Sequence, residues 1–118
     1  MNQPAFPDPA GTWNRRFAAD GFLFGTEPNA WLRDHAGVWQ PGQRVLSVAD
    51  GEGRNSVWLA KRGLRVDAFD IAEVGVEKAR RMAAEQGVSV NFSVADCDAF
   101  AWPEAAYDGV AAIFVQFA

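Results

Sequence analysis

Cysteine and histidine are almost missing from this chain of 118 residues, and their scarcity excludes several kinds of site. The only cysteine, Cys97, has no partner for a disulfide within the chain. The only histidine, His35, cannot form a metal cluster with a single cysteine, and no Ser/His/Asp arrangement favours acyl transfer. We therefore expect no metal, and we read the Cys97 thiol and His35 as structural residues.

Long apolar runs and basic runs are missing as well. The longest apolar stretches, such as 110–115, are far too short to span a membrane, and the first residues lack the pattern of a secretion signal. The net charge is −4, so no basic surface predicts binding to nucleic acid. With 49% hydrophobic and 22% charged residues, the composition is typical of a soluble domain, and we expect a cytoplasmic protein.

Two stretches of different character follow one another along the chain. Residues 1–42 are interpreted as an N-terminal arm, loose up to Thr12, with cover helices, and residues 43–118 as a βαβ half-domain. Helices are predicted over 13–19, 28–36, 55–62 and 73–86, and strands over 45–49, 64–69, 88–94 and 107–114. Strands that alternate with helices predict an α/β, Rossmann-like parallel sheet with flanking helices.

A glycine-containing turn, Ala49-Asp50-Gly51-Glu52-Gly53, joins the first predicted strand to the next helix. In open parallel sheets, ligands bind beyond the carboxyl ends of the strands, where glycine permits close approach and a helix start offers free N–H groups. We count Ala49, Asp50, Gly51, Gly53 and the nearby Asn55 as cofactor-binding candidates. A tight turn that only needs glycine for its shape would have the same sequence.

Acidic residues end the next two predicted strands. Asp70 follows Gly51 by 19 positions, the spacing at which a carboxylate accepts hydrogen bonds from ribose hydroxyls, and Ile71 would form an apolar wall for adenine. Asp96 could accept from the adenine amine, while the backbone N–H of Cys97 could donate to a ring nitrogen. Each aspartate, taken alone, could instead be a polar cap or turn residue.

These motifs together resemble the cofactor half of class I S-adenosylmethionine-dependent methyltransferases. The resemblance rests on the motifs G-E-G-R-N-S-V-W-L-A, then F-D-I and V-A-D. Within this class, the chain looks most similar to the small tellurite-resistance-like methyltransferases. Upstream, W-N-R-R-F and F-G-T-E-P-N look like the cover that this group places over the cofactor. The resemblance implies methyl transfer from S-adenosylmethionine to a small-molecule acceptor.

The same resemblance assigns roles to further residues. It implies that Gly51 and Gly53 lie against the methionine portion of the cofactor, that Phe24 and Gly25 cover the site, and that Gln116 lies near the sulfonium. It implies no fixed nucleophile, because such enzymes mainly align the acceptor with the activated methyl group, and the catalytic residues stay unknown.

The chain departs from the family pattern in two respects. Ser47 and Ala49 stand where the family has an acid and its first glycine, so we expect cofactor binding to be weaker or differently arranged. The family sheet has seven strands, and about four are predicted here. We therefore expect a bare edge on the fourth strand and self-association through that edge.

Two other functions stay open on the sequence. A nicotinamide-dependent oxidoreductase would need glycine or alanine at the third position of the glycine fingerprint, where Ser56 is small but atypical. A non-catalytic module that binds a cofactor or a protein partner would need only the part of the fold that the chain supplies.

Overall fold

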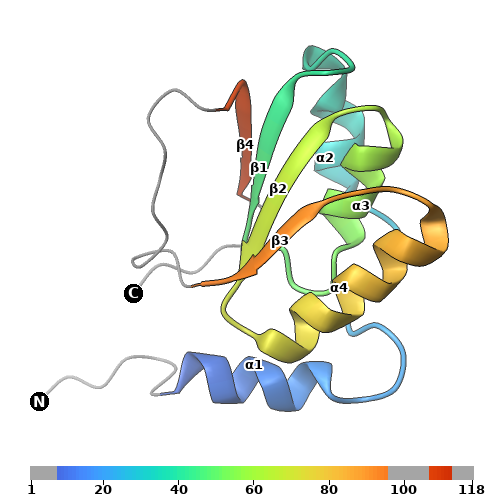
Figure 1. Cartoon of the computed structure of the whole chain (residues 1–118). Helices are drawn as coiled ribbons and strands as arrows, with labels where there is room; N and C mark the ends of the chain where they lie inside the picture. The colour runs from blue at the N-terminus through green and yellow to red at the C-terminus, as the bar shows by residue number, and fades with distance from the viewer. Residues whose placement is uncertain (1–7, 96–106, 113–118) are drawn as a thin grey trace, which may run out of the picture.

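A parallel sheet forms the centre of the molecule, and its strands are the apolar segments that the sequence predicted. The computed structural model describes residues 8–95 and 107–112. Four strands, β1 (Arg44–Val48), β2 (Arg65–Asp70), β3 (Asn91–Val94) and β4 (Gly109–Ala112), are hydrogen-bonded in the order β3-β2-β1-β4 (Figure 1). All three pairings are parallel, which confirms the Rossmann-like α/β prediction.

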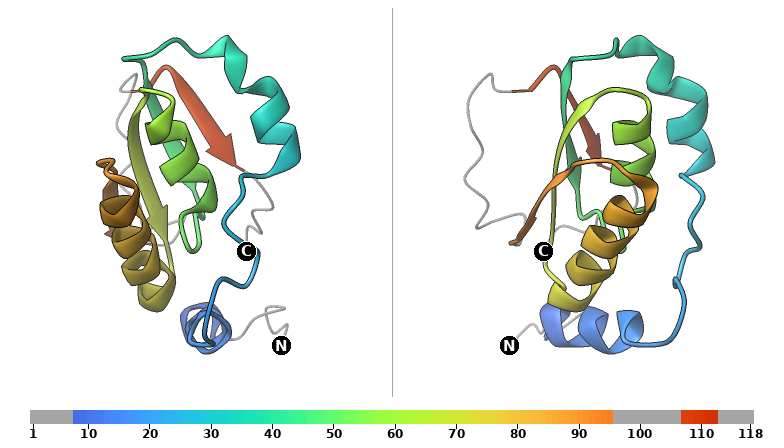
Figure 2. Two further views of the ribbon diagram at one scale, coloured as in Figure 1. Left: turned by 90° about the vertical axis from the view of Figure 1, so that its right-hand side faces the viewer. Right: turned by 45° about the vertical axis from the view of Figure 1, so that its right-hand side comes forward.

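Helices on one face of the sheet build the main core. α2 (Ala30–His35) with the 3₁₀ turn η1 (Ala36–Val38), α3 (Arg54–Lys61) and α4 (Glu73–Gln86) lie on the same side of the strands (Figure 2). Leu32 and Leu59 pack there on Val45, Val66 and Ala111, all of them buried. Burial of such side chains stabilises the fold by about 1.5–3 kcal/mol each.

The first helix takes a different place. α1 (Pro9–Phe17) lies across the carboxyl ends of β1 and β2, beside the start of α4 (Figure 1). Its last residue, Phe17, is buried against the glycine turn and α4. This arrangement places the N-terminal segment at the edge of the sheet where ligands bind in such folds.

Several predicted boundaries were wrong, and the N-terminal ones have a clear cause. The first helix covers residues 9–17 rather than 13–19, because Asp8 accepts a hydrogen bond from Gly11 N at 3.2 Å and Pro9 suits the first helical turn. The second begins at Ala30 after its cap Asn29, not at residue 28. Strand β3 begins at residue 91 rather than 88, whereas α4 has the predicted bounds.

Among the described residues, no helix combines the length and apolar character needed to cross a bilayer. The longest, α4, has 14 residues and several charged side chains.

Candidate functional site

The turn between β1 and α3 has an unusual backbone. Ala49, Gly51 and Gly53 all have positive φ, at 51°, 62° and 93°. Glycine adopts this left-handed region freely, but for alanine it costs roughly 1–2 kcal/mol. Ala49 nevertheless keeps this conformation, so the substitution of the family's first glycine leaves the turn in a left-handed shape.

A buried carboxylate holds this turn from inside. Asp50 is 7% exposed, and its Oδ1 accepts hydrogen bonds from Ser47 Oγ at 2.8 Å and Ser56 N at 3.1 Å. Its Oδ2 accepts from Ser56 Oγ at 2.6 Å. Burial raises the pKa of Asp50 to about 6, against the opposing effect of the hydrogen bonds from Ser56 and Ser47. Ser47 therefore contributes a donor, and the negative charge of this region sits three residues later, on Asp50.

The two glycines of the turn face different neighbours. A Cβ on Gly51 would meet the Phe17 ring at 3.4 Å, so α1 covers this glycine. A Cβ on Gly53 would lie 2.7 Å from Cβ of Ala79, because α3 and α4 approach closely there. Gly53 is thus required by helix packing, and its contact with the cofactor stays a prediction.

Asp70 lies at the carboxyl end of β2, next to the turn. Its Oδ1 accepts a hydrogen bond from Gly51 N at 3.1 Å, and its Oδ2 accepts from Ala72 N at 2.9 Å. Burial raises the pKa of Asp70, while the hydrogen bonds from Ala72 and Gly51 oppose this shift. Each carboxylate oxygen keeps a second lone pair, so the side chain can accept from two vicinal hydroxyls as well. Ile71 follows directly and is half-buried.

The cover over the turn is held by a buried ion pair. Glu52, in the middle of the glycine turn, accepts from Leu23 N at 2.7 Å and pairs with Lys78 Nζ at 3.0 Å. Lys78 also donates to the carbonyl oxygens of Ala19 and Gly21, both at 2.6 Å. Segment 19–23 is therefore fastened to the glycine turn and to α4 at once.

Two asparagines add further connections between the cover and the site. Asn55 Oδ1 accepts from Asn29 N at 2.8 Å, so its side chain holds the start of α2. Asn14 Oδ1 accepts from Val74 N at 3.0 Å and caps α4, whose own N-cap residue, Ala72, provides no side-chain hydrogen bond. Helix starts carry unpaired N–H groups, which explains why an amide oxygen 60 residues away in sequence is bound there.

Sequence reasoning missed Glu52 and Lys78, and it included Asn14 and Phe17 only as members of the W-N-R-R-F motif of the cover. A carboxylate between two glycines is a signal that could have been used, since a charged residue in a buried turn needs a partner. Of the predicted cover residues, Phe24 is 53% exposed and Gly25 N donates to Phe22 O within the cover. The predicted site residues Asp96, Cys97 and Gln116 lie outside the described residues.

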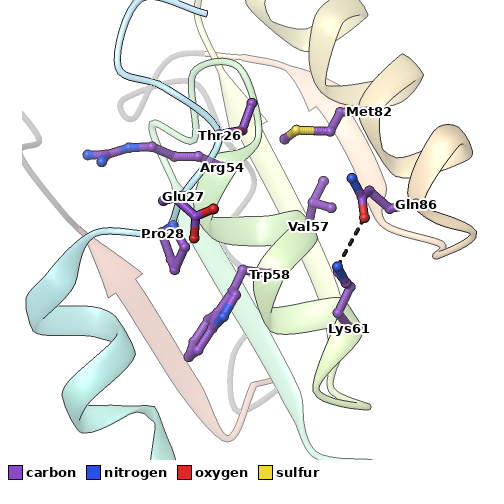
Figure 3. A pocket seen from close by; sticks show the side chains of 9 residues that line it. All are labelled: Thr26, Glu27, Pro28, Arg54, Val57, Trp58, Lys61, Met82 and Gln86. Carbon is purple, nitrogen blue, oxygen red and sulfur yellow. Dashed lines mark hydrogen bonds between the residues drawn. The ribbon is translucent and has the colours of Figure 1, made fainter.

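A small hollow lies between α3, α4 and the segment 26–28 (Figure 3). Its volume is about 130 Å³, and a hydrogen bond from Lys61 to Gln86 spans one side of it. Its lining consists of Thr26, Glu27, Pro28, Arg54, Val57, Trp58, Lys61, Met82 and Gln86. Asp50, Gly51 and Asp70 are not among the residues that line this hollow.

Comparison with known proteins identifies the group to which this geometry belongs. Residues 45–118 match the family described as Methyltransferase domain. The chain belongs to this methyltransferase family. S-adenosylmethionine is accordingly its cofactor, and the left-handed turn, the available lone pairs of Asp70 and the half-buried Ile71 beside it fit an adenosine-containing group. The nicotinamide-dependent alternative finds no support in this membership.

Individual proteins of known sequence are also similar to this chain. An uncharacterised protein of Mycobacterium tuberculosis is 35% identical over 79 residues, covering 66% of this chain and 29% of the relative. Ubiquinone biosynthesis O-methyltransferase of Methylocella silvestris is 35% identical over 74 residues, covering 63% of this chain and 29% of the relative. The chain thus spans less than a third of the length of these curated relatives.

Solved methyltransferase structures share the fold. The tRNA (uracil-54, C5)-methyltransferase of Pyrococcus abyssi, in complex with S-adenosyl-L-homocysteine, aligns with a TM-score of 0.59 and 29% identity, over 68% of this chain and 20% of that one. TehB from Haemophilus influenzae aligns with a TM-score of 0.65 and 19% identity, over 88% of this chain and 34% of that one. The second likeness shows the fold alone, and it extends over the N-terminal cover region that the sequence resemblance included.

Proposed function

We propose that this chain supplies the cofactor-binding half of an enzyme that methylates a small-molecule acceptor with S-adenosylmethionine. The observation that carries the proposal is the convergence of Asp70, Ile71 and the left-handed turn at the carboxyl edge of a parallel sheet, beneath a fastened cover. The relatives support the same reaction type, since those with a named activity include a ubiquinone biosynthesis O-methyltransferase and a tRNA (uracil(54)-C(5))-methyltransferase.

Each part of the site has a distinct task in this proposal. S-adenosylmethionine, when bound, supplies a methyl group activated by the sulfonium. Asp70 holds the ribose hydroxyls through its second lone pairs, and Ile71 forms one apolar wall. Phe17 and the cover exclude water from the glycine turn, which strengthens every polar contact there. Asp50 fixes the shape of the turn from inside through its hydrogen bonds with Ser47 and Ser56.

A small molecule is the acceptor class that the charge of this chain favours. Nucleic-acid binding depends on cationic side chains that neutralise phosphates, and the chain has 15 acidic against 11 basic residues. A tRNA acceptor, as the Pyrococcus relatives' names indicate for those proteins, is the alternative. That alternative would require a cationic surface on parts of the protein that this chain does not supply.

Calorimetric titration with S-adenosylmethionine, S-adenosyl-L-homocysteine and NADH tests the cofactor part of the proposal. We expect binding of the first two, no binding of NADH, and a loss of affinity of about tenfold or more in Asp70→Asn, since an amide cannot accept from both hydroxyls. Asp67→Asn is the matched control, because Asp67 lies in the same strand but bonds Arg44 and Tyr107. Equal losses in the two variants, or binding of NADH alone, would contradict the proposal.

A further inference from the structure

The ammonium group of Lys78 joins three parts of the molecule, namely α4, the glycine turn and the segment after α1. Its Nζ donates to Ala19 O and Gly21 O, both at 2.6 Å, and to Glu52 Oε2 at 3.0 Å. An ammonium group has three N–H donors, and three acceptors surround this one. None of the three belongs to α4, the helix that carries Lys78, so the polar contacts of this side chain hold other segments in place.

The carboxylate of Glu52 binds the same segment from the side of the glycine turn. Its Oε1 accepts from Leu23 N at 2.7 Å, while its Oε2 pairs with Lys78. The two side chains are 4% and 15% exposed, so each charge is largely removed from water and requires the other as its partner. Backbone groups of three alternate residues, 19, 21 and 23, are thus bound by one buried ion pair.

Apolar burial holds this segment only weakly. Apart from Phe22, which packs partly on the core, every residue from 18 to 25 is exposed, and Leu23 and Phe24 leave 41% and 53% of their surface in solvent. The backbone at Gly21 has positive φ, with no atom within 4 Å of an added Cβ. Segments with so little buried apolar surface open locally at low free energy. The attachment of this segment therefore depends mainly on the buried ion pair.

The same ion pair holds the end of α1, which lies across the carboxyl edge of the sheet (Figure 1). Phe17 is the last residue of α1, and Ala19, whose carbonyl group Lys78 binds, comes two positions later. A Cβ on Gly51 would meet the Phe17 ring at 3.4 Å, and one on Gly75 would meet it at 2.9 Å. The ring thus fills the space between the glycine turn and the start of α4, beside the residues proposed to bind the cofactor.

We infer that Glu52 and Lys78 are positioning residues that hold α1 closed over the methyl donor, and that their separation lets the donor enter and leave. We call these two side chains the latch. With the latch intact, α1 and the segment 19–23 stay on the glycine turn. With the latch broken, they move away from Gly51 and Asp70 together. This inference rests on the proposed methyltransferase function and adds the residues that set the rate of cofactor exchange.

The first test is amide hydrogen exchange of the 118-residue chain, followed by NMR without any ligand. The Leu23 N–H donates to Glu52 and reports the state of the latch, whereas the amides of β1, between β2 and β4, report the stability of the sheet. We expect Lys78→Met to speed exchange at Leu23 by about tenfold or more and to leave the β1 amides nearly unchanged. Equal acceleration at both places would indicate general destabilisation and would overturn the inference.

The second test is stopped-flow mixing with S-adenosyl-L-homocysteine, followed by tryptophan fluorescence, which measures the rate constants of association and dissociation. We expect Lys78→Met to raise both by about tenfold, because the fraction of molecules open to the ligand limits both steps. A damaged binding site would release its ligand faster but would not take it up faster. An association rate constant that is unchanged or lower in the variant would therefore overturn the inference.

Two further variants complete the design. Lys61→Met is the matched control, because Lys61 is also a hydrogen-bonded lysine but donates to Gln86 at 3.0 Å, so its rates should equal those of the original chain. The double variant Glu52→Gln/Lys78→Met leaves no unpaired charge in the interior, which protects the fold. Since the latch acts as one unit, its rates should match those of Lys78→Met. Effects of the two single variants that multiply in the double variant would contradict the latch.

The two tests separate this inference from the proposed function. If the original chain binds no S-adenosyl-L-homocysteine, the methyltransferase proposal fails, and hydrogen exchange at Leu23 still decides whether the latch exists. If the ligand binds with the same rate constants in the original chain and in Lys78→Met, the methyltransferase proposal stands and the control of exchange by the latch is wrong. Faster exchange at Leu23 together with faster binding and release supports both statements.

Discussion

Replacing Asp50 by asparagine should make the protein more stable at neutral and alkaline pH. The carboxylate is buried and receives three hydrogen bonds, but no cation among the described residues compensates its charge. Burial is the main cause that raises its pKa from 3.8 to about 6, and the charge of Asp70 acts in the same direction. Asparagine has the same shape, and its amide can donate to Ser56 Oγ where the carboxylate accepts.

The sign and size of the effect follow from proton linkage. A carboxyl with a raised pKa in the folded state binds its proton more tightly there than in the unfolded chain. Its contribution to stability is therefore complete below pH 3.8 and is lost as the pH rises through about 6. With about 1.4 kcal/mol for each pKa unit, the loss amounts to roughly 3 kcal/mol. Asp50→Asn should not show this loss.

The assay is urea unfolding followed by tryptophan fluorescence at pH 4.5, 6 and 8. The free energy of unfolding of the variant should exceed that of the original chain by about 1 kcal/mol at pH 4.5 and by about 3 kcal/mol at pH 8. Asp70 remains in both proteins, so its raised pKa cancels in the difference. The control is Asp34→Asn, an exposed carboxylate beside Arg33. Parallel pH profiles for Asp50→Asn and the original chain would refute the reasoning.

Three further perturbations test the packing, the capping and the edge of the fold. Gly53→Ala should lower the free energy of unfolding by about 2–5 kcal/mol, because the new Cβ clashes with α4 and the backbone has positive φ. Gly87→Ala, also at positive φ but in open space, should lower it by only about 1 kcal/mol, and urea titration compares the two variants. Asn14→Ala should cost about 1 kcal/mol through loss of the α4 cap, and an unchanged urea midpoint would contradict this. We also propose that the edge of β4 that pairs with no other described strand mediates self-association. Val110→Lys should then reduce the weight-average mass in sedimentation equilibrium, and a monomer in both proteins would disprove it.

The sequence predicted the sheet and its connecting helices well, because their signals are local. Apolar runs of strand length, the glycine after α4 and the spacing from Gly51 to Asp70 depend on neighbouring residues. The N-terminal helix was misplaced because the three prolines of residues 1–12 were interpreted as a sign of a loose arm, although Pro9 after Asp8 is a helix start.

The interior of the site was harder to predict, because its contacts join distant parts of the chain. Nothing in the local sequence around Glu52 shows that Lys78 lies next to it, or that Asn14 caps a helix 60 residues later. Ser47 had been interpreted as an uncharged substitute for an acid. The structure shows that Ser47 donates a hydrogen bond to the buried carboxylate of Asp50, which the sequence did not predict.

The connections between the cover and the site also determine an order of assembly. Asn14, Ala19, Leu23 and Asn29 bind partners that lie 60, 59, 29 and 26 positions further along the chain. Contacts over such separations require the intervening chain to be organised first, since the entropy of closing those loops must be overcome. The segment on the N-terminal side of the sheet is therefore synthesised before the partners that hold it. During synthesis, Phe17 cannot be buried against Gly75 until α4 has emerged, so this aromatic side chain stays accessible to chaperones in the meantime.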